Sequence, residues 1–229
     1  MTSPSETGLS RRSLLITLGV LGGAGGGVFA APAGAAAPVA AAERSWTGRL
    51  SQNGWPVIDR ARTAVCALEG TGDTLRLRPG PVTAILQHVA RRFHYEVSAL
   101  GPGDVGGFAT STLVAAPLES NYLSGTAFAI RPDLYPAGSA DNLFPLELLA
   151  VRDILAECEG VVRWGGDDAT TPKEGHFQID VPPGDPELGR VASRITGWRG
   201  HPGRGAGVTP DLGAAKRRAA AVELQRRQS

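Results

Sequence analysis

Residues 145–181 read PLELLAVRDILAECEGVVRWGGDDATTPKEGHFQIDV, and this stretch holds the signals that decide the fold. Apolar residues three and four positions apart predict a helix over Pro145–Glu157. Val161–Trp164 is short and largely apolar, and the two glycines that follow it predict that it is a strand with a turn after it. His176–Val181 alternates between apolar and polar residues before two prolines, which predicts a second strand. The apolar positions of the helix are Leu148, Leu149, Val151, Ile154 and Leu155.

A second helix and further strands are predicted upstream of this stretch. Pro81–Phe93 reads PVTAILQHVARRF and gathers its apolar residues on one helical face, so we expect a helix with one buried side. Tyr95–Val114 is rich in glycine and predicts a loop. Glu43–Gly80 alternates around Leu75 and Leu77 and predicts one or two strands. Short strands interleaved with helices indicate an α+β fold, a small antiparallel sheet with flanking helices. The buried face of the helix comprises Val82, Ile85, Leu86, Val89 and Phe93.

The composition is that of a globular protein. Of the 229 residues, 42% are apolar and 20% are charged, and only two are cysteine. These values exclude a collagen-like repeat, a disulfide-dense miniprotein and a wholly disordered chain.

The first 42 residues have the pattern of an export signal. Arg11 and Arg12 precede a run from Ser13 to Ala42 that carries no charge and ends in alanine-rich sequence, which is typical of a twin-arginine signal peptide. The run is also long enough for a transmembrane anchor, but its many glycines make it weakly hydrophobic and a poor helix. We therefore expect cleavage near Ala42, with Ala30 as the alternative, and a protein that is extracellular or associated with the cell wall without a stable membrane span.

The remaining chain divides by charge into two parts. Residues 43–196 carry 14 basic and 19 acidic side chains, whereas residues 197–229 carry seven basic and two acidic ones. The second part opens with several glycines, and Leu212–Gln228 can form a short basic helix. We therefore expect a domain over residues 43–196 and a separate basic tail over residues 197–229, which is either solvated without a specific partner or drawn to anionic polymers or lipid headgroups by charge. The export signal argues against nucleic acid as that partner.

Cys66 and Cys158 are the only cysteines, and the sequence leaves their state open. In an exported protein they can be oxidised to a disulfide, which would close a long loop and stabilise the fold by about 4 kcal/mol. The alternative is two buried thiols.

One pair of residues carries the chemistry of a hydrolase. Glu174 and His176 stand two positions apart at the start of a predicted strand, where a period of two places both side chains on one face. A histidine can ligate zinc and a neighbouring glutamate can accept a proton from the metal-bound water. A glutamate and histidine at this spacing also occur as a simple surface pair.

The surroundings of this pair resemble a known family. The motifs are SNYLSGTAFAI at 120–130, Tyr135-Pro136, RDIL at 152–155, GVVRWGGD at 160–167 and EGHFQI at 174–179. In order and spacing they are similar to the D-alanyl-D-alanine carboxypeptidase (VanY-type) metallopeptidases, most of all to the phage endolysin L-alanyl-D-glutamate peptidases. The resemblance runs from about Pro81 to Ile179. It implies a small α+β domain that holds one zinc ion and cuts peptidoglycan stem peptides.

Carried over by residue, the resemblance implies a degenerate zinc site. His176 matches one zinc ligand and Glu174 the general base, but Tyr122 and Ala129 stand where the family has its histidine and aspartate ligands. Alanine has no donor atom, and a phenol with a pKa of about 10 is a poor ligand at neutral pH. The scaffold around the lost ligands is retained, which implies a cleft bordered by Ser124, Gly125 and Trp164. Residues considered as replacement ligands are Asp133, Asp141, Asp167, Asp168, His88 and His94.

Three hypotheses of function follow. The first is an exported, catalytically inactive protein that binds peptidoglycan stem peptides or a partner through the old cleft, with the basic tail adding attraction to anionic wall polymers. The second is an active cell-wall peptidase with a rearranged zinc site. The third is a structural protein whose cleft is closed by the Tyr122 ring on His176. We favour the first.

Overall fold

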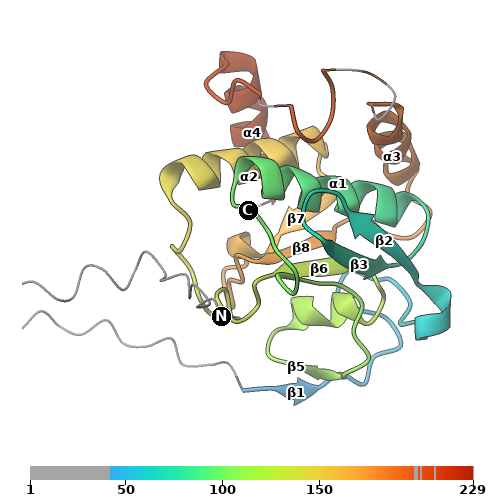
Figure 1. The fold of residues 1–229 in the computed structure, drawn as a ribbon. Coiled ribbons are helices and arrows are strands. Elements are labelled where there is room, and N and C mark those ends of the chain that lie inside the picture. Colours follow the sequence, from blue (N-terminus) through green and yellow to red (C-terminus); the bar gives the residue numbers. More distant parts are fainter. Residues whose placement is uncertain (1–41, 199–200, 202, 209, 229) are drawn as a thin grey trace, which may run out of the picture. The chain divides into compact units, whose positions relative to one another are not determined.

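The computed structural model describes residues 42–198, 201, 203–208 and 210–228, so the predicted signal peptide lies outside the described residues apart from Ala42. The order of elements agrees with an α+β fold (Figure 1). The strands are β1 Arg44–Ser45, β2 Ala64–Leu68, β3 Asp73–Leu77, β4 Val105–Gly106, β5 Leu113–Val114, β6 Ala127–Ile130, β7 Val162–Trp164 and β8 His176–Ile179. The helices are α1 Pro81–Glu96, α2 Pro145–Glu157, α3 Pro186–Trp198 and α4 Ala215–Gln228.

The central sheet is antiparallel, with the strand order β4-β6-β8-β7. Two smaller pairs accompany it: β2 with β3, and β1 with β5. In the central pair Phe128 of β6 lies opposite Phe177 of β8, and Ala129 lies opposite His176. Because side chains alternate along a strand, this register sends the phenylalanines to one face of the sheet and sends Ala129 and His176 to the other.

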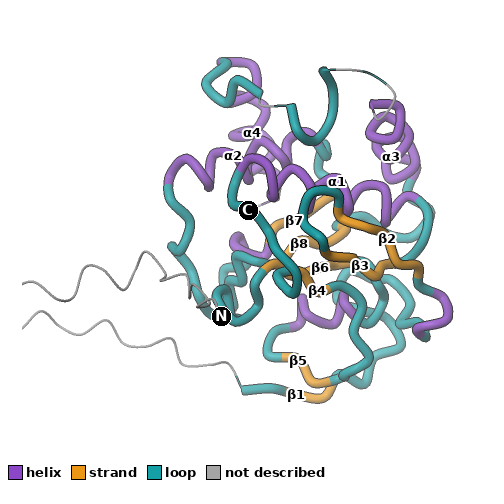
Figure 2. Tube along the Cα trace, in the orientation of Figure 1, coloured by secondary structure: helices purple, strands orange, loops and turns teal. Residues whose placement is uncertain are grey.

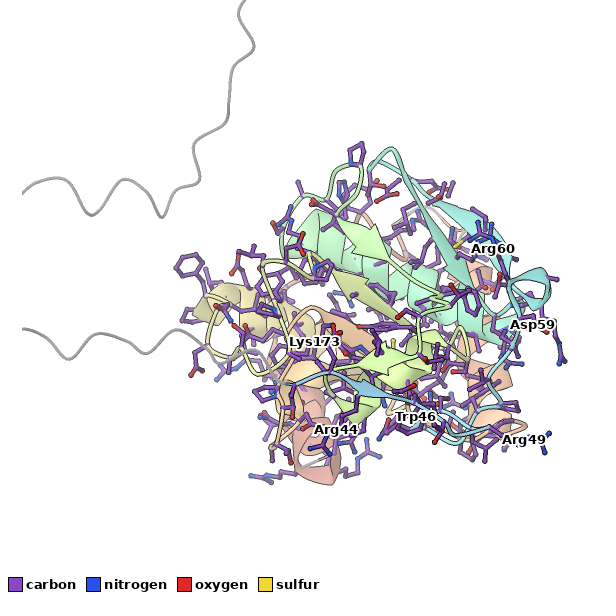
Figure 3. The ribbon with its side chains drawn as sticks, turned by 90° about the horizontal axis from the view of Figure 1, so that it is seen from below. Arg44, Trp46, Arg49, Asp59, Arg60 and Lys173 are labelled. Carbon is purple, nitrogen blue, oxygen red and sulfur yellow. The ribbon has the colours of Figure 1, made fainter. Side chains whose placement is uncertain are left out.

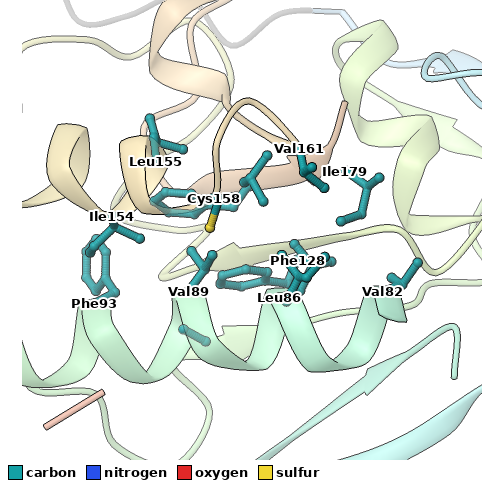
Figure 4. Close-up of a cluster of buried hydrophobic side chains, with 14 of the residues drawn as sticks. Val82, Leu86, Val89, Phe93, Phe128, Ile154, Leu155, Cys158, Val161 and Ile179 are labelled. Carbon is teal, nitrogen blue, oxygen red and sulfur yellow. The ribbon is translucent and has the colours of Figure 1, made fainter. Parts of the chain in front are cut away.

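Helices α1 and α2 lie on the face of the sheet to which the phenylalanines point (Figures 1 and 4). The Phe177 ring stacks on Phe128 with 5.4 Å between centroids and meets the edge of Phe93 of α1 at 6.0 Å. All five apolar positions predicted for the buried face of α1 are almost completely buried. The core of the domain is therefore the layer between the two helices and one face of the sheet.

The sequence-based boundaries agree with the structure at both ends of α2 and at one end of α1, β7 and β8. The helix predicted over Pro145–Glu157 has these bounds in the structure, and α1 begins at the predicted Pro81 but runs on to Glu96. The predicted loop Tyr95–Val114 is mostly loop but contains β4 and β5 (Figure 2). Within α2, Leu148 and Leu149 are only half-buried, because the helix turns Ala150, Val151 and Ile154 towards the core.

The basic segment over residues 197–229 is not a separate tail. The described part of the chain belongs to one compact unit, and α4 packs against α2. Ala221 and Leu224 of α4 are buried, and Arg217 forms an ion pair with Asp153 of α2. The expected boundary at residue 196 instead falls inside α3.

The possible disulfide between Cys66 and Cys158 is not formed. The Cys158 thiol is fully buried at the end of α2, where burial raises its pKa to about 12. The Cys66 thiol on β2 donates a hydrogen bond to the carbonyl oxygen of Leu75 on β3, at 3.3 Å. The two sulfur atoms therefore lie in different elements and are not bonded to each other.

Among the described residues, no helix has the length and apolar character needed to cross a bilayer.

Candidate functional site

The three positions that the family resemblance assigns to metal ligands lie together in the structure. His176 is on the face of the sheet away from α1, and Ala129 is its cross-strand neighbour on β6. Tyr122 ends the 3-10 helix Pro117–Tyr122, and its hydroxyl lies 2.7 Å from Nδ1 of His176. The two rings meet edge to face, with 5.1 Å between centroids. A side-chain hydroxyl therefore holds the histidine nitrogen that faces Tyr122.

A chain of hydrogen bonds fixes the tautomer of His176. The backbone N–H of Asn53 donates to Oδ1 of Asn121 at 3.0 Å, so Nδ2 of Asn121 is the donor to Oε1 of Gln178 at 2.8 Å. The same Oε1 accepts from Nε2 of His176 at 2.9 Å. Nε2 thus carries the proton and Nδ1 accepts from the Tyr122 hydroxyl. Both ring nitrogens are engaged.

Burial sets the charge of these two groups. His176 is fully buried, and burial lowers its pKa to about 3, with the ammonium group of Lys173 acting in the same direction. Burial also raises the pKa of Tyr122 well above its usual value, and the Glu119 carboxylate adds to this effect. At neutral pH the pair is therefore a neutral imidazole that accepts a hydrogen bond from a protonated phenol.

These residues do not fit a zinc ion. A hydrolytic zinc site needs three protein ligands and an open position for water. Here Ala129 offers no donor, the Tyr122 phenol keeps its proton, and both nitrogens of His176 have other partners. Among the described residues, no group of three or more histidine, cysteine, aspartate or glutamate side chains can hold a metal ion.

The residues considered as replacement ligands have other roles or lie elsewhere. His88 contacts Glu157 of α2, at 2.9 Å, and the Nδ1 of His94 accepts from the backbone N–H of Leu100. Asp167 pairs with Arg152, and Asp168 accepts from the backbone N–H groups of Thr170 and Thr171. Asp133 and Asp141 are exposed.

Glu174 lies in the turn before β8, so the alternation that was expected to place it on the face of His176 does not extend to it. Its carboxylate is buried and accepts a hydrogen bond from the backbone N–H of Asn142 at 2.9 Å. Its backbone carbonyl accepts from the indole of Trp164 at 2.6 Å. Glu174 therefore fastens the chain before α2 to the turn before β8.

The residues predicted to border a cleft are buried parts of the scaffold. The Ser124 hydroxyl is completely buried and lies 2.9 Å from that of Ser51. Gly125 has a φ of 67°, and a Cβ atom there would come within 2.8 Å of the backbone nitrogen of Arg78. Trp164 is 3% exposed, with the Arg152 guanidinium over its ring.

An ion pair between Lys173 and Glu119 covers the Tyr122 ring, and sequence reasoning missed it. Lys173 is buried, and its ammonium group lies 5.4 Å from the ring centroid of Tyr122. The second carboxylate oxygen of Glu119 accepts from the backbone N–H of Ala115 at 2.6 Å. Although burial acts in the opposite direction, the hydrogen bond from Lys173 lowers the pKa of Glu119. The partners lie 54 residues apart in the chain, so no local spacing indicates the pair.

Beside this covered site lies an open cavity of about 520 Å³. Its lining includes Arg44, Ser45, Trp46, Ala115, Thr170 and Thr171. Figure 3 shows Arg44, Trp46 and Lys173 on the side of the molecule that is seen from below. The Lys173–Glu119 pair joins the chain just after Thr171 to the chain just after Ala115, so it ties together two walls of the cavity. We call this cavity the β1 groove.

A scan of protein-family models, a search of curated proteins and a search of solved structures each returned no match to this chain. The likeness to the peptidase family therefore rests on the sequence motifs.

Proposed function

We propose that this chain is an exported protein with a peptidase-like fold that has lost catalysis and binds peptidoglycan stem peptides. The observation that carries the proposal is His176, whose two ring nitrogens are held by Tyr122 and Gln178 while Ala129 stands opposite. A histidine in this state cannot activate water through a metal, because no lone pair is available for the metal. We therefore place ligand binding in the open β1 groove beside this buried pair.

The β1 groove offers the chemistry that a peptide ligand needs. Its volume of about 520 Å³ lies within the range of ligand sites. Arg44 supplies a guanidinium for a carboxylate, and Trp46 supplies an aromatic surface. Within the described part of the chain β1 pairs only with β5, so an extended peptide can also form backbone hydrogen bonds along the strand.

Exposed cations on α4 would strengthen attachment to the wall. Lys216, Arg218, Arg226 and Arg227 are all exposed, whereas Arg217 is held by Asp153. Charges of this kind attract anionic wall polymers over a distance of about a Debye length. We infer that the helix adds affinity without setting specificity.

The test is binding of the full chain to a soluble stem pentapeptide, measured by calorimetry, together with a search for cleavage products. We expect binding without cleavage. Arg44→Gln and Trp46→Ala should each weaken binding by about tenfold, while Arg49→Gln, which removes an exposed arginine outside the groove, should leave it unchanged. Equal affinity in all four proteins would remove the groove as the binding site.

One further outcome would point to the structural alternative, and another to catalysis. The contact of the Tyr122 ring with His176 is the feature that favours a structural role with a closed cleft. That role predicts no peptide binding at all by the wild type. Cleavage of peptidoglycan that Glu174→Ala abolishes would instead show an active peptidase and overturn our proposal.

A further inference from the structure

A second cavity, of about 420 Å³, lies where α3 packs on α1. Its lining includes His88 and Arg91 of α1, Ile195 and Trp198 of α3, and His201 and Arg204 after α3. None of these residues borders the β1 groove or the site at His176. The cavity is therefore a separate feature of the molecule, and we call it the α1–α3 cavity.

Arg91 presents an unused donor here. Its Nη2 pairs with Glu69 at 2.6 Å, and that glutamate side chain is 68% exposed. Its Nε is buried and has no hydrogen-bond partner. A buried donor without a partner costs about 1–3 kcal/mol, so a shift of the Arg91 side chain that brings Nε–H onto a ligand oxygen would recover this energy. The Nε–H edge of a guanidinium is part of the fork that grips a carboxylate or a phosphate with two parallel hydrogen bonds.

The charge of the lining favours an anion. Among the described residues that line it, the cavity has two guanidinium groups, those of Arg91 and Arg204, against the single carboxylate of Glu69. Arg204 is exposed and can move onto a ligand. The His201 ring is positioned by the hydrogen bond that its Nδ1 donates to the carbonyl oxygen of Gly197, at 2.7 Å.

The remaining wall is apolar and aromatic. Ile195 is 2% exposed, and the Trp198 ring contacts a guanidinium and an imidazole. The Arg194 guanidinium lies 5.4 Å from its centroid and the His88 ring 5.6 Å. A fixed indole beside an isoleucine suits a flat apolar group rather than a bare hydrated ion.

We propose that the α1–α3 cavity binds an organic oxyanion, a carboxylate or phosphate attached to an apolar ring. The oxyanion contacts Arg91 and Arg204, and the ring packs on Trp198 and Ile195. This site is independent of the proposed binding of stem peptides in the β1 groove.

The test is calorimetry on the full chain at neutral pH with three probes: phenyl phosphate, benzoate and inorganic phosphate. We expect at least one of the two aromatic probes to bind more tightly than inorganic phosphate, and the better probe identifies the oxyanion. Arg91→Gln and Arg204→Gln should each weaken its binding by about tenfold. Arg60→Gln, which removes an exposed arginine elsewhere, is the matched control and should bind as the wild type does.

Three results would overturn the inference. They are no binding of any probe, inorganic phosphate binding as tightly as the aromatic probes, and an equal loss in the Arg60→Gln control. Should Arg91→Gln fail to fold, Arg204→Gln still decides, because Arg204 is exposed in a loop.

Discussion

The Tyr122 and His176 side chains explain at the scale of single residues why the site around His176 is closed to a metal ion. A buried imidazole must have partners for both nitrogens, and a phenol that donates to Nδ1 satisfies the one that Gln178 does not. The arrangement is stable as a network of neutral groups. Restoring a metal would require removing the phenol and supplying two further ligands.

Tyr122→Phe tests the hydrogen bond between these residues. The substitution keeps the ring but leaves Nδ1 of a fully buried histidine without a donor, so we expect the free energy of unfolding to fall by about 1–3 kcal/mol. Tyr95→Phe is the control, because Tyr95 is 48% exposed and the change there should stay within about 0.5 kcal/mol. Urea unfolding measures both. Equal effects would show that the Tyr122 hydroxyl has no structural role.

The pKa of His176 predicts how stability depends on pH. Its folded value of about 3 lies below the ordinary value of 6.5, so the unfolded chain binds a proton that the folded chain does not. The contribution of the neutral His176 to the free energy of unfolding is complete above pH 6.5 and is lost as the pH falls towards 3. In this window the free energy of unfolding changes by up to about 1.4 kcal/mol per pH unit. In His176→Gln the slope in this window should be smaller by about one proton. Identical slopes would contradict the buried neutral imidazole.

The sequence predicted some of these residues and not others. The family motifs led to Tyr122, Ala129 and His176, which the structure brings together. Gln178 stands two residues after His176, so the period of two places both side chains on one face, but no local spacing indicates its partners Asn121 and Gln52, which lie 57 and 126 residues away. For Glu174 the period-of-two argument was wrong because Glu174 lies in the turn before the strand, which begins at His176 as predicted.

At the scale of elements, the helices with broad apolar stripes were predictable and the docking of the last helix was not. α1 and α2 bury a continuous apolar face, and this is the pattern that sequence periodicity detects. α4 buries only Ala221, Leu224 and Gln228 and is otherwise basic, so its composition resembles that of a solvated helix. Its position depends on contacts distant in sequence, such as the hydrogen bond from Gln228 to the carbonyl oxygen of Val162.

Leu224→Ala tests whether α4 is docked. Leu224 is 3% exposed and lies close to Gly160. Its truncation to alanine should therefore lower the free energy of detaching α4 from the domain by about 2–5 kcal/mol. Val222→Ala, at a half-exposed position of the same helix, is the matched control. Hydrogen exchange of the α4 amides should accelerate in Leu224→Ala alone. The same exchange rate in both variants would show that α4 is not packed on the domain and that the segment is a separate tail.

At the scale of the whole molecule, docking α4 fixes a basic surface onto an otherwise acidic body. The segment 197–229 has seven basic side chains against two acidic ones, and residues 43–196 have the opposite balance. Attraction between the two parts helps to hold α4, as the Arg217–Asp153 pair shows. The cations that remain exposed are free to meet an anionic polymer.

The double variant Arg226→Gln/Arg227→Gln tests this surface. We expect weaker binding to an anionic polymer such as polyphosphate, because both side chains are exposed. The wild type should also lose affinity when salt rises from about 50 to about 200 mM, since screening shortens the reach of the charges. The control is Arg49→Gln/Arg60→Gln, which changes net charge equally but not on α4. An equal loss in the control would assign the binding to net charge rather than to the helix.

We propose that this chain has a peptidase-like scaffold without metal chemistry, and zinc binding tests this proposal most directly. The measurement is the zinc content of the purified full chain after equilibration with the metal, beside His176→Ala. The account predicts no stoichiometric zinc in either protein, because the only histidine at the site has both nitrogens engaged. Tight stoichiometric zinc in the wild type that His176→Ala loses would contradict it, and peptidoglycan cleavage would then become the leading function.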